Sequence, residues 1–359
     1  MLVEYKKYNV LEATKKRIAY VFDEFDNVVV SVSGGKDSTT LWHLSLIEAK
    51  KRDKKIRLFF LDQEAEYKST IEQIEYMMQH ESIEPMWYQV PILLTNATSY
   101  NQIFLDAWYE GKEWIHEKHE LAIHSIDKDY PKRFYPFFDW IERQYKEKTA
   151  FLVGLRSKES LNRFRTISNK PGYKNIFWST KTKNNNVFRF YPLYDWTFGD
   201  VWKYIHDNKL RYNKIYDKMF LKYGINMSSM RVSNLIHEKA YKSLSDIQEF
   251  EPDTFERLLK RLDGVHCAAI YAKEDLIYSS NKLPQSFSSW REYRDYLLKT
   301  SALPDDKKQR LIKRFSNQPQ NEYVYRQQCK QILIGDWENN VPCELRAKDK
   351  LRKIWWDKL

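Results

Sequence analysis

The sequence predicts an α/β fold with a doubly wound, mainly parallel sheet of five strands. Two observations predict it. Short runs of apolar, often β-branched residues alternate with longer stretches in which apolar residues recur at helical spacing. The first short run, residues 28–32, ends in Ser33-Gly34-Gly35, and a helical pattern begins directly afterwards. We therefore expect parallel strands joined by right-handed helical crossovers, with a ligand site at the carboxyl ends of the strands.

Each element follows from its own pattern. Residues 9–25 mix apolar and charged side chains with helical periodicity, which predicts an amphipathic helix before the first strand. The expected strands are residues 28–32, 56–61, 86–90, 150–154 and 187–191, and a polar hairpin or loop over 181–186 precedes the last of them. The expected helices between the first strands are residues 37–51 and 67–80.

Residues 95–148 interrupt this alternation. They are rich in aromatic and charged side chains, and we expect a helical insertion that ends in a helix over 138–146. The aromatic rings are suited to stacking on nucleobases, but aromatic residues dominate ordinary core packing, so packing against the sheet is the expected role.

The pattern beyond residue 197 is helical. Helices are expected over 199–207, 212–223 and 252–262, and further helices over 286–359, broken near Pro304, Pro319 and Pro342. We therefore divide the chain into an α/β domain, residues 1–235, and a helical, basic C-terminal region, residues 236–359.

The charge balance is basic. The 60 Lys and Arg residues outnumber the 49 Asp and Glu residues, which gives a net charge of +11. Residues 299–359 hold +6 of it, from 14 basic and 8 acidic residues. This excess fits an anionic partner such as a nucleotide or a nucleic acid, although distributed lysines also serve solubility. A hydrophobic content of 42% excludes intrinsic disorder.

Several classes of protein are not expected. The chain has no apolar window long enough to span a membrane and no N-terminal apolar run typical of a signal peptide, so we expect a cytoplasmic protein without a membrane partner. The three cysteines, Cys267, Cys329 and Cys343, lack the spacing of a zinc site or an iron–sulfur cluster, so neither is expected. The spacing of His116, His119 and His124 fits no usual zinc site either.

The segment Ser-Gly-Gly-Lys-Asp-Ser at residues 33–38 carries the clearest chemistry. Its glycines allow close backbone approach, and the helix that follows points N–H groups at an anion. It is neither a Walker A loop nor the dinucleotide-binding Gly-x-Gly-x-x-Gly. After a buried strand, this segment resembles the PP-loop of the adenine nucleotide alpha-hydrolase superfamily, which includes ATP pyrophosphatases and phosphoadenylylsulfate (PAPS) reductases.

Two further segments narrow the resemblance to the PAPS reductase group. Residues 154–160, followed by Arg163 and Arg165, resemble its Gly-x-Arg-x-x-Glu-Ser…Arg segment. Residues 191–205 resemble its Pro-Leu-x-Asp-Trp-Thr…Asp-Val-Trp-x-Tyr-Ile segment. The likeness spans about residues 25–225. Residues 161–166 also resemble a subgroup of prophage co-activators encoded beside ParB-like proteins, which implies a ParB-like partner.

Roles for these residues follow from their chemistry. Backbone amides of the loop and two hydroxyls bind phosphates, Lys36 neutralises developing charge, and Asp37 holds Mg²⁺ or fixes the loop. Arg156 is suited to forked recognition of phosphate or sulfate. The catalytic candidates are Lys36, Asp37 and Arg156. The candidates for nucleotide binding are Ser33, Gly34, Gly35, Lys36, Asp37, Ser38, Asp62, Gln63, Gly154, Arg156, Glu159, Arg163 and Arg165.

The sequence departs from the reductases at their cysteine. They act through a C-terminal Glu-Cys-Gly-x-His motif, whereas Cys343 is followed by Glu344 and Leu345. Thiol-dependent PAPS reduction is therefore not expected.

Three functions stay open at this stage. The first is an ATP-using enzyme that splits ATP into AMP and pyrophosphate, with Mg²⁺, and adenylylates an unknown acceptor. The second is a PAPS- or adenylylsulfate-binding enzyme, a reductase or a sulfotransferase-like one. The third is a nucleotide-sensing regulator without catalysis that acts with a ParB-like partner on DNA.

Overall fold

The computed structural model describes residues 6–99, 102–168, 172–226, 230–237, 244–271, 283–284, 286–301, 303–333, 335–339 and 343. The chain divides into two compact units. Unit 1 consists of residues 1–94 and 106–234, and unit 2 consists of residues 95–105 and 235–359. The chain therefore leaves unit 1 for the short segment 95–105, returns, and leaves it again after residue 234.

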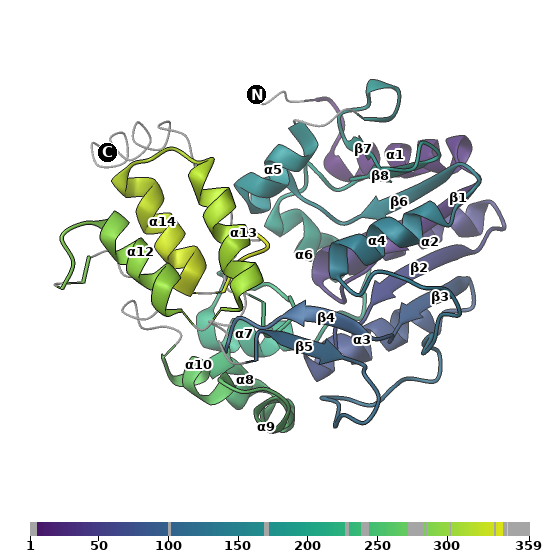
Figure 1. Cartoon of the computed structure of the whole chain (residues 1–359). Helices are drawn as coiled ribbons and strands as arrows, with labels where there is room; N and C mark the ends of the chain where they lie inside the picture. Colours follow the sequence, from purple (N-terminus) through teal and green to yellow (C-terminus); the bar gives the residue numbers. More distant parts are fainter. Residues whose placement is uncertain are drawn as a thin grey trace. The chain divides into compact units, whose positions relative to one another are not determined.

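Unit 1 contains a six-stranded sheet in the order β3-β2-β1-β6-β8-β7 (Figure 1). The first five of these strands are parallel to their neighbours, and β7 at the edge pairs antiparallel with β8. The strands are β1 (Asn27–Ser31), β2 (Ile56–Leu61), β3 (Ile83–Tyr88), β6 (Thr149–Val153), β7 (Ser179–Lys181) and β8 (Val187–Phe190). The mainly parallel α/β fold predicted from the sequence is confirmed.

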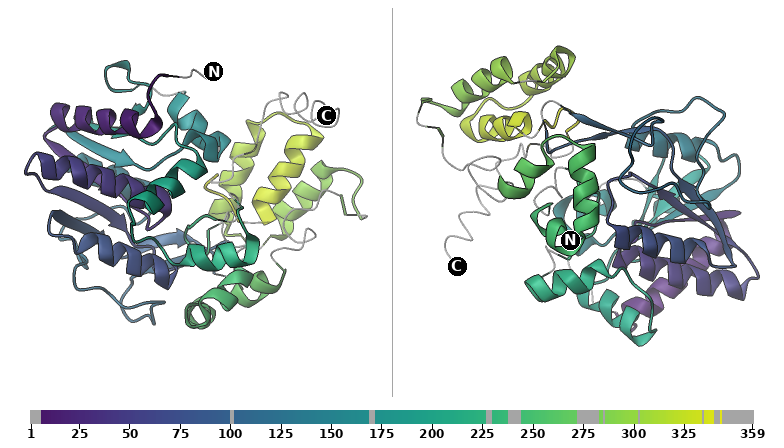
Figure 2. Two further views of the ribbon diagram at one scale, coloured as in Figure 1. Left: turned by 180° about the vertical axis from the view of Figure 1, so that it is seen from behind. Right: turned by 90° about the horizontal axis from the view of Figure 1, so that it is seen from below.

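Helices cover both faces of the sheet, as Figures 1 and 2 show. On one face, side chains such as Val30 and Leu152 belong to a buried cluster with residues of α1, α2, α3 and α6. On the other face, the rings of Phe59 and Phe151 contact Phe138 of α4. Both faces of the central strands are thus buried, which explains their continuous apolar runs. The helices of unit 1 are α1 (Val10–Glu24), α2 (Lys36–Lys51), α3 (Lys68–Met78), α4 (Phe134–Arg143), α5 (Leu161–Ser168), α6 (Phe198–Asp207) and α7 (Ile215–Tyr223).

Two expectations about unit 1 are wrong. The sheet has six strands, not five, because β7 forms the second arm of the hairpin expected near residues 181–186. The segment 95–148 is not a helical insertion. Among its described residues it holds the end of β4 (Ile92–Thr95), β5 (Phe104–Ala107) and one helix, α4. Backbone amides of this segment donate to buried side chains and not to carbonyls of a helix.

Unit 2 is helical in the part that the structure describes. Its helices α12, α13 and α14 enclose an apolar cluster that includes Leu297, Leu311, Phe315 and Trp337. No described helix of either unit has the length and apolar character that a membrane span requires. The helices of unit 2 are α8 (Leu244–Phe250), α9 (Pro252–Arg261), α10 (Val265–Tyr271), α12 (Trp290–Thr300), α13 (Asp305–Ser316) and α14 (Glu322–Leu333).

The central strand β6 provides a test of the core. Leu152 is fully buried, whereas Leu221 on α7 is 83% exposed. We expect Leu152→Ala to lower the free energy of unfolding by about 2–5 kcal/mol, because it removes buried methyl groups and leaves a cavity. Leu221→Ala is the control and should change it by less than about 0.5 kcal/mol. Urea unfolding of both variants measures this, and equal effects would contradict the core assignment.

Candidate functional site

The loop between β1 and α2 is held by its own residues and by side chains of neighbouring segments. Gly34 has φ +65°, and a Cβ there would lie 2.8 Å from Cγ2 of Thr70, so only glycine fits. The hydroxyl of Ser38 donates to the Gly35 carbonyl at 2.9 Å and accepts from the Ser33 amide at 3.2 Å. Gly35 caps α2 without a side chain, and the first amide of the helix, that of Lys36, donates to the hydroxyl of Tyr216 at 3.2 Å.

Lys36 is the buried cation of this loop. Its side chain is 3% exposed, and its Nζ donates to the carbonyl of Met230 at 3.2 Å. The rings of Phe198 and Tyr216 lie 5.5 and 5.4 Å from that Nζ. Burial lowers the pKa of Lys36, and the neighbouring Asp37 carboxylate opposes this shift. The ammonium group is thus shielded from water and lies beside the carboxylate of Asp37 at the start of α2.

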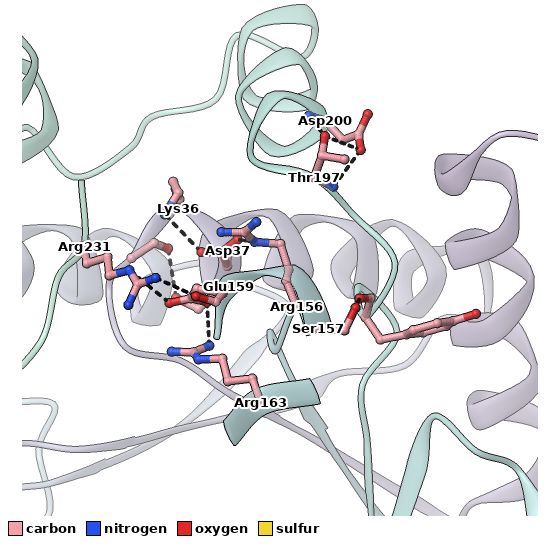
Figure 3. Close-up of polar contacts among 12 residues, drawn as sticks. Lys36, Asp37, Arg156, Ser157, Glu159, Arg163, Thr197, Asp200 and Arg231 are labelled. Atoms are coloured by element: carbon pink, nitrogen blue, oxygen red, sulfur yellow. Dashed lines mark hydrogen bonds and ion pairs between the residues drawn. The ribbon is translucent and has the colours of Figure 1, made fainter. Parts of the chain in front are cut away.

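Asp37 is shared by two cations. One of its oxygens lies 3.2 Å from Nζ of Lys36, and the other accepts from Nε of Arg156, which is 4% exposed (Figure 3). Arg156 follows β6, the strand paired with β1, so parallel pairing brings it to the loop. Gly154 permits this approach, because a Cβ there would lie 3.1 Å from the Asp37 backbone. The three catalytic candidates predicted from the sequence therefore lie together.

A second carboxylate, Glu159, stands beside this pair. Nη1 of Arg163 lies 2.8 Å from one carboxylate oxygen of Glu159, and Nε of Arg231 lies 3.7 Å from the other (Figure 3). Nη2 of Arg231 also donates to the backbone carbonyl of Glu159 at 2.7 Å. Sequence reasoning missed Arg231, because it comes from a segment far along the chain with no motif of its own. Together the two carboxylates face four cations, Lys36, Arg156, Arg163 and Arg231. This part of unit 1 therefore carries an excess of positive charge.

Arg165 does not join these residues. It lies two positions after Arg163 on α5, and such a spacing turns side chains about 200° apart around a helix. Arg165 is exposed, whereas Arg163 points to Glu159. The cluster predicted from the sequence therefore keeps Arg156 and Arg163 but not Arg165.

Asp62, one of the candidates for nucleotide binding, is fully buried. One of its oxygens accepts from Nε1 of Trp87 and Nε2 of Gln89, both at 3.0 Å. The other accepts from the amide of Glu64 at 2.9 Å and lies 3.2 Å from Nε2 of His116. Because these four groups fill its acceptor sites, its side chain fixes the loop after β2 rather than offering a nucleotide contact. Its neighbour Gln63 is half-buried, and its expected role stays a prediction.

Glu64 and Gln89 accept hydrogen bonds from backbone amides of the segment 95–148, which was expected to be helical. Glu64 accepts from the amides of Trp108 and Ile115, at 3.1 and 3.3 Å. The side-chain oxygen of Gln89 accepts from the amide of His119 at 2.6 Å. Backbone groups that would bond within a helix are satisfied by buried side chains instead, so the segment wraps irregularly over the sheet edge.

The residues do not fit a Mg²⁺ ion held by Asp37. Both of its oxygens already face a cation, and Mg²⁺ binds oxygen ligands that are free to coordinate. Among the described residues, no group of three His, Cys, Asp or Glu side chains is arranged to hold a metal ion. Asp37 instead fixes the loop, the other role that its chemistry suggests.

The thiols of Cys329 and Cys343 are not activated for nucleophilic attack. Burial raises the pKa of Cys329 to about 12 and that of Cys343 to about 12. Both groups are thiols near neutral pH, whereas attack on sulfate requires a thiolate. Cys267 lies exposed on α10. All three belong to unit 2.

The chain is similar to several known proteins. An Escherichia coli (strain K12) protein, "Uncharacterized protein YbdN", is 28% identical over 83% of this chain and 76% of its own. Adenosine 5′-phosphosulfate reductase 2 of Bacillus subtilis (strain 168) is 24% identical over 57% of this chain and 73% of its own. A crystal structure of Candida glabrata FMN adenylyltransferase with FMN and an ATP analogue is similar with a TM-score of 0.39. It is 15% identical, over 65% of this chain and 66% of the other.

The fold defines an α/β protein with a mainly parallel sheet, and the loop of residues 33–38 follows the central strand β1. Residues 27–244 match the phosphoadenosine phosphosulfate reductase domain, so the chain belongs to that family. Residues 224–328 match a domain of unknown function, DUF3440. The family resemblance carried by the three sequence motifs is confirmed.

The buried pair of His116 and Asp62 predicts a pH dependence. Burial disfavours the charged ring, but the Asp62 carboxylate raises the pKa of His116 above its ordinary value. The pair therefore stabilises the fold below the ordinary histidine pKa of about 6.5, and this stability is lost as the pH rises through the raised value. We expect His116→Gln to cost about 3 kcal/mol at about pH 5.5 and clearly less at about pH 9. Melting curves at both pH values measure this.

His124 provides the control, because it is exposed and its Nε2 contacts only a carbonyl among the described residues. His124→Gln should leave both melting temperatures nearly unchanged. An effect of His116→Gln that is equal at the two pH values would mean that the ring acts by packing and not by charge.

Proposed function

We propose that the protein binds ATP at residues 33–38 and cleaves it between the α- and β-phosphates. An acceptor oxygen attacks the α-phosphorus, the bond to the β-phosphate breaks, and pyrophosphate leaves. The acceptor is thereby adenylylated, and AMP is released when a second nucleophile displaces it. The acceptor is not identified by these residues.

The observation that carries the proposal is the arrangement of Lys36 and Arg156 around the single carboxylate of Asp37. Two buried cations share one anion at the start of a helix whose N-cap residue is a glycine. Such a site favours an incoming polyphosphate, because it adds negative charge where cations and N–H groups are already oriented. Asp37 positions both cations before the nucleotide arrives.

Lys36 and Arg156 would stabilise the charge that builds on the departing pyrophosphate. They lie in a water-poor site, where a fixed cation stabilises developing charge more strongly than in water. Arg163 and Arg231, held by Glu159, are suited to a further phosphate or sulfate oxygen. The adenine nucleotide as ligand class is supported by the relatives named for adenosine 5′-phosphosulfate.

PAPS is the alternative substrate, because the arginines around Glu159 suit a sulfate as well as a phosphate. Reduction would also need a reactive thiolate, which Cys329 and Cys343 do not supply because burial raises their pKa values. Titration calorimetry with ATP and with PAPS separates the two ligands. Tight binding of PAPS without binding of ATP would overturn the proposal.

Turnover is tested by pyrophosphate release from ATP with Mg²⁺ in solution. Lys36→Ala and Arg156→Ala should each lower the rate about 100-fold or more, because each removes a group that stabilises transition-state charge. Arg143→Ala on α4 is the matched control, since Arg143 is exposed and outside the cluster, and its rate should equal that of the wild type. ATP binding without any pyrophosphate release would favour the nucleotide-sensing regulator instead.

A further inference from the structure

Unit 2 presents a row of polar and basic side chains along one face of α13. Arg310, Lys313, Arg314 and Asn317 follow the spacing i, i+3, i+4 and i+7, which places them on one side of the helix. The opposite side holds apolar residues of the unit 2 cluster, such as the fully buried Leu311. We call these four residues the α13 basic face. The helix thus separates an apolar side from a cationic one.

Two cations of this face form no ion pair within 4.0 Å among the described residues. Among the described residues, neither Arg310 nor Lys313 forms an ion pair, and both are exposed. At the start of the same helix, by contrast, Lys307 pairs with Asp306 at 3.0 Å, and Lys308 lies 4.0 Å from Asp305. Lys313 and Arg314 lie in the last turn of α13, where cations stabilise the helix, whereas Arg310 lies one turn earlier and adds a like charge three and four residues from them.

A cavity opens on this face. Its volume is about 470 Å³, and it is lined by the four residues together with Trp337 and Glu338. Trp337 is buried and packs edge-on against Phe104, 5.2 Å between ring centres, which makes a rigid wall. Three cations and one carboxylate line the cavity, so it favours an anion.

Arg314 adds an independent observation. Its Nη2 donates to the carbonyl of Trp337, which fixes the guanidinium against the wall of the cavity. Its Nη1 is buried and has no hydrogen-bond partner in the part of the chain that the structure describes. A buried donor without an acceptor is costly, and an anionic oxygen that reached it would satisfy it.

We propose that the α13 basic face binds the sugar-phosphate backbone of a nucleic acid. Residues 310 to 317 extend over about 10 Å at 1.5 Å per residue, a length that a single phosphate does not cover but that successive backbone phosphates do. Arginine, lysine and asparagine are the side chains that commonly contact such phosphates. This site is distinct from residues 33–38 and does not depend on the function proposed for them.

The test is fluorescence anisotropy of the full-length protein with labelled single-stranded and duplex oligonucleotides over a series of salt concentrations. Arg310→Ala with Lys313→Ala removes two backbone contacts from exposed helical positions, where alanine preserves the helix. We expect the magnitude of the slope of log K against log salt to fall by about 1.4 to 1.8, because each phosphate contact that is lost reduces the number of counterions released on binding. A melting curve checks that the variant is folded.

Lys260→Ala with Lys308→Ala is the matched control, since it removes the same charge from unit 2 outside the basic face. It should leave the slope nearly unchanged, and Lys36→Ala should leave it unchanged as well. Equal losses in the two double variants would overturn the proposal, as would the absence of oligonucleotide binding at low salt. Binding of inorganic phosphate as tight as that of the oligonucleotides would show a site for a single phosphate and not for a polymer.

Discussion

The carboxylate of Asp37 is the constraint on which the site of unit 1 depends. It is one anion between two buried cations, one from its own loop and one from the strand that pairs with β1. Burying either cation without an anionic partner would be costly. Because both are paired with Asp37, they are already positioned for an anionic ligand. The parallel pairing of β1 with β6 is therefore as important to the chemistry as the loop itself.

A second buried carboxylate, Asp62, has a different task. It holds the loop after β2 through three hydrogen-bond donors and an ion pair with His116, and Glu64 beside it holds the segment that follows β5. The two acids at the carboxyl ends of β1 and β2 thus divide their roles. One arranges two cations, and the other fixes the loop after β2.

The two units share an excess of positive charge but organise it differently. In unit 1 the cations around Asp37 and Glu159 are paired and partly buried, which suits a small polyphosphate held in one geometry. In unit 2 two cations of the α13 basic face, Arg310 and Lys313, are exposed, and all three follow a helix, which suits an extended anion. A net charge of +11 alone does not separate these two cases.

The sequence by itself determined the parallel strands, the loop of residues 33–38 and the family, because these depend on local patterns of a few consecutive residues. It did not predict β7, since an edge strand of three residues carries too short a pattern. Only the tertiary structure decided that the carboxylate oxygens of Asp62 are occupied by neighbouring groups, that Arg165 points away from Arg163, and that Arg231 lies beside Glu159. Those outcomes depend on contacts between residues far apart in the chain, and periodicity along a sequence does not encode such contacts.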